Sequence, residues 1–107
     1  MSPDLAVSAV QELAQLTIVP GSAGEFEAAF GKVLPALRSA SGCLGAELLR
    51  SVDVPDTYVL RVDWARLEDH TEHFPASEAG QQVFEVLKSY CAGPPHVIHV
   101  ATAGVNG

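Results

Sequence analysis

Positive charge is scarce in this sequence. Lys and Arg together number 6 against 13 Asp and Glu, which leaves a formal net charge of −7 at neutral pH. Phosphate-bearing surfaces repel a chain of this balance, so nucleic acids and anionic membranes are not expected partners. A small neutral or weakly acidic organic molecule is a better match as a ligand.

Cysteine is also scarce, and several familiar motifs are missing. Cys43 and Cys91 are too few for a disulfide framework and are typical of small buried hydrophobic residues. The sequence contains no CxxC, GxGxxG, Walker-type or GxSxG pattern. Dithiol redox, nucleotide and acyl-serine chemistry therefore have no support from the sequence.

Long apolar runs are absent as well. No stretch approaches the roughly 18 uninterrupted apolar residues that a membrane-spanning helix needs. The first residues, Met1-Ser2-Pro3-Asp4, lack the basic and apolar segments of a signal peptide. We therefore expect a cytoplasmic protein without a membrane segment.

What the sequence does have is the composition of one globular domain. It has 107 residues, 48% of them hydrophobic and 18% charged. This size favours a single domain over residues 1–107, with its core at about 11–103 and flexible ends, the first nine residues among them.

Apolar periodicity predicts four strands and two helical regions. The strands are expected at 11–19, 44–52, 58–64 and 96–101, with the second and third joined as a hairpin through the turn at 53–56. The first helix opens at Ser22 or Gly24 and ends at 41–42, and Pro35 should kink it or shift it near Gly31. The second region, 67–90, should break at 74–75, with Ser77 as a weak N-cap.

This order is β-α-β-β-α-β, the α+β, ferredoxin-like plan of an antiparallel sheet with both helices on one face. The uncovered face is expected to carry Leu49, Val59 and Val97. Because an apolar open face needs a cover, a second copy of the chain is the expected partner, giving a homodimer.

Four short segments resemble the antibiotic biosynthesis monooxygenase (ABM) family. They are Pro20-Gly21, residues 42–45 (Gly-Cys-Leu-Gly), residues 58–60 (Tyr-Val-Leu), and Trp64 followed by His70. The resemblance covers about residues 11–103 and implies a dimeric α+β barrel of ferredoxin-like subunits. The family includes cofactor-independent monooxygenases that turn phenolic anthrones into quinones, and haem-degrading enzymes.

The resemblance can be carried over residue by residue. Trp64 matches the tryptophan that lines the pocket in both branches, and Phe74 matches a retained phenylalanine. Leu60 and His70 stand where the anthrone oxygenases have an asparagine and a tyrosine, and Ala14 stands where the haem degraders have an asparagine. The resemblance thus implies an aromatic pocket without those amides.

Two candidate catalytic residues follow, Trp64 and His70. Trp64 shares strand parity with Tyr58, Leu60 and Val62, so it faces the helices either as core or as a pocket wall that stacks a planar substrate. His70 lies on the predicted sheet-facing side of its helix. A neutral imidazole, with a pKa of about 6.5, could accept a phenolic proton, and the resulting carbanion-like species can react with O₂ directly.

The candidate substrate-binding residues are Tyr58, Leu60, His73, Phe74, Phe84 and Arg50. Tyr58 or His73 would orient an oxygen, and Arg50 could hold a phenolate. No metal is expected, because a helical i, i+3 histidine pair supplies at most two ligands. In the last strand His96 and His99 have opposite parity and cannot face one site.

We therefore expect a cofactor-independent monooxygenase that uses O₂ as co-substrate on a phenolic or polycyclic, polyketide-like aromatic in secondary metabolism. No bound cofactor is expected, and flavin or haem is less favoured. Two alternatives stay open: a non-oxidative polyketide cyclase or isomerase, and a non-catalytic ligand-binding or stress-response barrel.

Overall fold

The computed structural model describes residues 9–106, in which four strands and two long helices follow one another in the order β-α-β-β-α-β. The strands are β1 (Val10–Thr17), β2 (Cys43–Arg50), β3 (Thr57–Trp64) and β4 (His96–Val100). The long helices are α2 (Ala23–Arg38) and α4 (Glu78–Tyr90). A π-helix (Asp69–His73) and the short α3 (Phe74–Ala76) precede α4, and a 3-10 turn (Gly104–Asn106) follows β4. The predicted ferredoxin-like α+β fold is confirmed.

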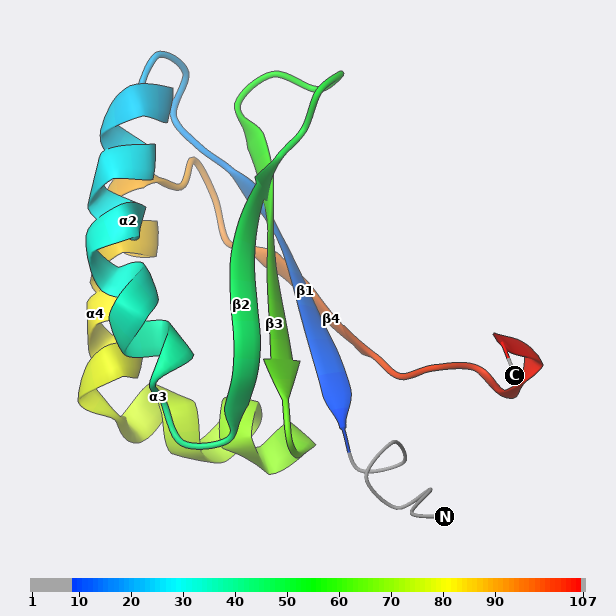
Figure 1. The fold of residues 1–107 in the computed structure, drawn as a ribbon. Helices are drawn as coiled ribbons and strands as arrows, with labels where there is room; N and C mark the ends of the chain where they lie inside the picture. The colour runs from blue at the N-terminus through cyan, green and yellow to red at the C-terminus, as the bar shows by residue number, and fades with distance from the viewer. Residues whose placement is uncertain (1–8, 107) are drawn as a thin grey trace.

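The four strands form one antiparallel sheet in the order β2-β3-β1-β4. Figure 1 shows α2 and α4 together on one face of this sheet and the opposite face uncovered. On β3 every second residue, from Tyr58 to Trp64, is buried and faces the helices. Strict period-two burial is what a sheet with one covered face requires.

The core lies between the sheet and α2. Phe26, Phe30 and Leu37 of α2 are fully buried, and Val33, the fourth residue of the predicted apolar stripe, is half-buried. The spacing of these residues follows the 3.6-residue period, so one face of the helix meets the sheet. Across from them, β1 contributes Leu16.

Two details of the helices differ from expectation. The helix α2 runs to Arg38 without a break at Pro35, whose missing N–H leaves only one helical hydrogen bond unmade, near the C-terminal end. The second helical region breaks at Ser77 rather than at 74–75, because Ser77 is extended. The Ser77 hydroxyl accepts the Gly80 N–H at 3.0 Å, so the predicted N-cap is confirmed.

The prediction for the open face was right for two residues and wrong for one. Leu49 and Val59 pair with each other on that face. Val97 instead pairs with Ala14, whose side chain is buried under the helices, so Val97 faces the helices too. The open-face residue of this part of β4 is Ile98. The sequence of β4 has no alternation of apolar and polar residues to fix its parity.

Cys43 and Cys91 are free thiols and only half-buried. The expectations for residues 1–8 lie outside the described residues. Among residues 9–106, no helix combines the length and apolar character needed to cross a bilayer.

Candidate active site

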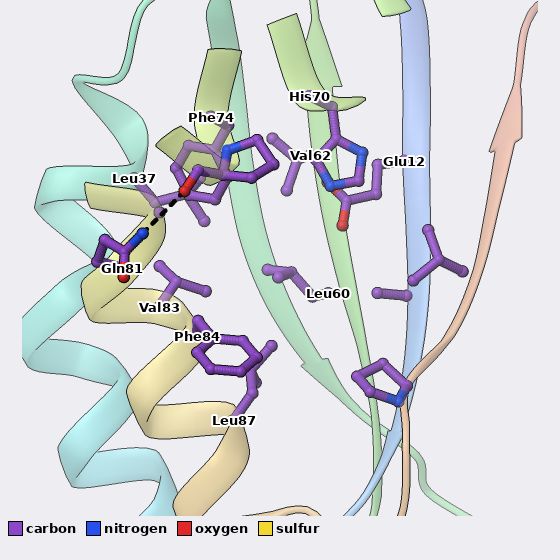
Figure 2. Close-up of a pocket in the computed structure, with 15 residues that line it drawn as sticks. Glu12, Leu37, Leu60, Val62, His70, Phe74, Gln81, Val83, Phe84 and Leu87 are labelled. Carbon is purple, nitrogen blue, oxygen red and sulfur yellow. Dashed lines mark hydrogen bonds and ion pairs between the residues drawn. The ribbon is translucent and has the colours of Figure 1, made fainter. Parts of the chain in front are cut away.

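A cavity of about 410 Å³ opens between the sheet and the helices α3 and α4. Figure 2 shows its lining side chains converging from β1, β3, the π-helix and α4. Most of them are apolar: Ala14, Leu37, Leu60, Val62, Phe74, Pro75, Gly80, Val83, Phe84, Leu87, Pro95 and Val97. The volume falls within the roughly 300–1,000 Å³ that small-molecule sites occupy.

Three polar residues complete the lining: Glu12, His70 and Gln81. The Gln81 side-chain amide donates to the Pro75 carbonyl at 3.1 Å, the dashed contact in Figure 2. Glu12 and His70 are therefore the ionisable groups of the lining, and they lie together at one end of the cavity.

Glu12 is buried because of its position on β1. It shares parity with Ala14 and Leu16, which face the helices, and its residue is only 6% exposed. The indole N–H of Trp64 donates to Glu12 Oε1 at 2.9 Å. Burial raises the pKa of the Glu12 carboxyl above its usual range, and the Trp64 hydrogen bond opposes part of that rise.

His70 packs flat on Trp64 beside Glu12. The two rings are stacked with centroids 5.5 Å apart and an interplanar angle of 12°. His70 Nε2 lies 3.3 Å from Glu12 Oε1, and His70 Nδ1 lies 2.7 Å from Nε2 of His99. Burial, helped by the nearby His99, lowers the pKa of His70 to about 4. The imidazole is therefore uncharged at neutral pH.

The π-helix directs His70 toward the sheet. Its first residue, Asp69, is buried and accepts the Arg66 backbone N–H at 3.1 Å. Asp69 also lies against Gly42, where φ is +81° and a Cβ atom would collide with the Asp69 carboxylate. Single π turns are rare and are frequent at functional sites. Here the turn places His70 and Phe74 on the cavity.

Four of the predicted site residues line this cavity: Leu60, His70, Phe74 and Phe84. Trp64 lies behind them rather than in the lining, fully buried and in contact with His70 and Phe74. It touches the site through its hydrogen bond to Glu12.

His73 does not reach the cavity. Its Nδ1 lies 3.2 Å from Asp69 Oδ1, and its side chain is about half-exposed. This contact is the largest of the causes that lower the pKa of Asp69.

Tyr58 and Arg50 lie in a second hollow of about 310 Å³ at the other end of β3. The Tyr58 hydroxyl donates to Glu27 Oε2 at 2.5 Å, and Arg50 Nε lies 3.6 Å from the same oxygen. Burial, reinforced by the Glu27 contact, raises the pKa of Tyr58 to about 12. The structure does not bring these residues together with His70.

Among the ionisable residues of the cavity, Glu12 was not predicted from the sequence, and neither was the contact between His70 and His99. The sequence did contain a signal for Glu12. It shares strand parity with Ala14 and Leu16, so its carboxyl is expected on the buried face of the sheet. Among the residues from 9 to 106, no three His, Cys, Asp or Glu side chains lie close enough to hold a metal ion together.

Two sequence comparisons relate this chain to known proteins. The family model for antibiotic biosynthesis monooxygenase matches residues 10–89. The uncharacterized protein YczJ of Bacillus subtilis strain 168 is 34% identical over 90 residues, which cover 84% of this chain and 95% of YczJ.

Solved structures of bacterial proteins are also similar to this chain. A Bordetella bronchiseptica protein assigned to the same family superposes with a TM-score of 0.84 at 32% identity, covering 90% of this chain and 98% of its own. A Caulobacter crescentus protein superposes at 0.78 with 19% identity, covering 95% of this chain and 96% of its own, which shows the shared fold alone. From the matched span and these identities, the chain belongs to the antibiotic biosynthesis monooxygenase family.

Proposed function

We propose that this protein is a cofactor-independent monooxygenase that oxidises a phenolic, polycyclic aromatic substrate with O₂. The observation that carries the proposal is the apolar cavity of about 410 Å³ with a buried carboxyl and an uncharged imidazole at one end. An aromatic substrate suits the apolar walls, and a buried acid–base pair suits removal of a phenolic proton. Membership in the family supports the oxidative chemistry.

The proposal gives the role of base to Glu12 and a supporting role to His70. We expected His70 to be the base, but its pKa of about 4 makes it a weak one, and both of its nitrogens already have close partners. The contacts of Glu12 with Trp64 and His70 both use Oε1, which leaves Oε2 for a substrate. A carboxyl whose pKa is raised by burial is also the stronger base.

The proposed reaction balances without a cofactor. In the enol form of such a substrate the ring carbon opposite the hydroxyl is a C–H carbon, so when Glu12 takes the hydroxyl proton the resulting phenolate delocalises charge onto that carbon. The carbon bonds to O₂ to give a peroxide. Loss of its C–H proton then breaks the O–O bond, which turns the carbon into a carbonyl while the second oxygen atom leaves as water. The substrate loses two hydrogen atoms and supplies all four electrons that reduce O₂. A substrate that fills the mostly apolar cavity excludes water from the reacting carbon.

A non-oxidative cyclase or isomerase is the second candidate. It is favoured by the same pair of groups, because an acid and an imidazole suffice to move protons within a substrate. The third candidate, a non-catalytic ligand-binding or stress-response barrel, would be favoured by a cavity filled with its own side chains. The open volume of about 410 Å³ does not meet that condition.

The test is oxygen uptake combined with product mass on a panel of anthrones and hydroquinones, using dialysed protein without added cofactor. We expect uptake above the uncatalysed rate and a product that has gained one oxygen and lost two hydrogens. A product of unchanged mass would favour the isomerase. Neither uptake nor any new product across the panel would contradict both enzymatic functions.

We also propose that two copies pair through the open face of the sheet. Leu49 and Ile98 are 44% and 47% exposed there, and each pairs with another apolar residue of the same face, Leu49 with Val59 and Ile98 with Leu13. Charged Arg61, Glu47 and Asp63 on the same face form their own ion pairs, so they do not prevent association. Light scattering that finds a monomer at micromolar concentration would contradict the dimer.

A further inference from the structure

His99 makes a close contact with the cavity's imidazole although it does not line the cavity. It lies on β4 directly opposite Glu12 of β1, so the two side chains project from the same face of the sheet. The π-helix brings His70 above this pair, and its two nitrogens reach one partner each. Glu12, His70 and His99 thus form a continuous row from the buried cavity wall to the exposed edge strand.

The contacts determine where the protons lie. Glu12 Oε1 already accepts the Trp64 N–H, so it is an acceptor toward its second neighbour, His70 Nε2, as well. A lone pair on Nε2 at 3.3 Å from this oxygen would be repelled, whereas a proton on Nε2 makes the contact attractive. Neutral His70 then carries its proton on Nε2 and has a lone pair on Nδ1.

That lone pair needs a donor, and His99 supplies it. The 2.7 Å between His70 Nδ1 and His99 Nε2 leaves room for one proton, which must then belong to His99. Which nitrogen of a histidine carries the proton is set by the hydrogen bond that the other nitrogen makes. A donor at Nδ1 therefore selects the Nε2–H form of His70.

We propose that His99 is a positioning residue that holds His70 in its Nε2–H tautomer and so keeps Glu12 Oε2 free as the base. The Trp64 N–H donates to Oε1 and His70 Nε2 lies 3.3 Å from the same oxygen, so a rotation of the carboxylate would disturb both contacts. The effect on turnover rests on the proposed function, whereas the tautomer does not.

The tautomer can be read without any substrate. Long-range proton–nitrogen NMR on protein labelled with ¹⁵N-histidine, at neutral pH, reports which ring nitrogen of His70 is protonated. We expect one form in the wild type, with the proton on Nε2, and a mixture of both forms in His99→Leu. A proton on Nδ1 in the wild type, or an unchanged single form in His99→Leu, would overturn the proposal.

Two further variants separate the hydrogen bond from general disturbance. His96→Leu changes the other histidine of β4, which pairs with Gln15 on the open face, and should keep the wild-type tautomer. His99→Gln retains an N–H donor at the same position and should largely restore it. A mixture in His96→Leu, or no restoration in His99→Gln, would mean that the hydrogen bond is not the cause.

Turnover then links the tautomer to catalysis. In His99→Leu we expect kcat to fall about tenfold, as for loss of an orienting partner, with KM little changed because His99 does not line the cavity. Equal kcat in wild type and His99→Leu would remove the catalytic part of the proposal. If the wild type itself turns over no substrate, the proposed function fails, and the NMR result still decides on the tautomer.

Discussion

The two ends of β3 carry similar pairs of groups in different surroundings. At one end the indole of Trp64 donates to Glu12 at 2.9 Å, and at the other the hydroxyl of Tyr58 donates to Glu27 at 2.5 Å. Each carboxyl also has a nitrogen-bearing side chain nearby, the imidazole of His70 in the first pair and the guanidinium of Arg50 in the second. Both pairs lie on the helix-facing side of the sheet.

What differs is the access of water to the carboxyl. The Glu27 side chain is 41% exposed and has the permanent charge of Arg50 beside it, whereas the Glu12 side chain is 7% exposed and has an uncharged imidazole. Desolvation without a compensating charge raises the pKa of Glu12. The comparison shows that a carboxyl bound to an aromatic donor becomes a candidate base only where burial is not offset by a cation.

The most direct test of the difference between the two ends is to neutralise Glu12 and Glu27 in separate variants. Glu12→Gln removes the proposed base and should lower the oxygen-uptake rate about 100-fold, within the range that a general base contributes. The matched variant Glu27→Gln should leave the rate near that of the wild type. Equal losses in the two variants would contradict the assignment of the site to the Glu12 end.

A second prediction concerns the stability of the two ends against pH. Because the pKa of His70 falls from 6.5 to about 4 on folding, the unfolded chain binds more protons between these values. This contribution to the free energy of unfolding is complete above pH 6.5 and is lost as the pH falls toward 4. The raised pKa of Glu12 acts in the opposite sense. Its contribution to the free energy of unfolding is present below pH 4.5, the usual pKa of the group, and is lost as the pH rises.

Urea unfolding at several pH values measures the contribution of His70 to the free energy of unfolding. When the pH is lowered from 7 to 5, the free energy of unfolding of the wild type should fall by about 2 kcal/mol more than that of His70→Gln, because only the wild type has a histidine whose pKa is lowered on folding. His96→Gln, on the open face, is the control and should follow the wild type. A pH dependence that is the same in all three proteins would mean that His70 is not buried uncharged.

The two aromatic donors provide a third comparison. Trp64→Phe keeps a ring under His70 but removes the N–H that holds Glu12 Oε1, so the pKa of Glu12 should rise further. Tyr58→Phe changes the donor at the other end and should leave Glu12 unaffected. Carbon NMR of labelled glutamate follows the carboxyl through a pH titration. A pKa of Glu12 that falls in Trp64→Phe would contradict the role given to the indole.

The smallest expected effect is at the mouth of the cavity. Phe84 lines the cavity and is still 58% exposed, so it offers an aromatic face to an entering substrate. Phe84→Ala should raise KM about fivefold and change kcat by less than about twofold, as one lost aromatic contact would. Val52→Ala, in the exposed hairpin turn away from the cavity, is the matched control. An unchanged KM in Phe84→Ala would exclude Phe84 from substrate binding.

Much of the fold could be predicted because its signals are local. The period-two burial of β3 and the apolar stripe of α2 follow from where successive side chains point. The side of β4 that carries Val97 could not be predicted, because its apolar residues do not alternate. The π turn that begins at Asp69 also has no sequence pattern of its own, and the packing of Asp69 against Gly42 joins residues that are far apart in the sequence.

The candidate site was also predictable in part, because strand parity is a local signal. Parity placed Leu60 and Tyr58 correctly on the helix-facing side, but parity says nothing about position along the strand. Tyr58 lies six residues from Trp64, about 20 Å at the rise of a strand, so Tyr58 lines a different hollow from the cavity that Trp64 lies behind. Strand parity was enough to put the Glu12 carboxyl on the buried face, but its contacts with Trp64 and His70, which make it a candidate base, have no sequence signal.

The central claim is that this cavity adds oxygen from O₂ to an aromatic substrate without a cofactor. The most direct test is a reaction under ¹⁸O₂ with dialysed wild-type protein and an anthrone that it turns over, followed by mass spectrometry of the product. The account predicts one ¹⁸O atom in the new carbonyl. A product formed without the label would contradict it.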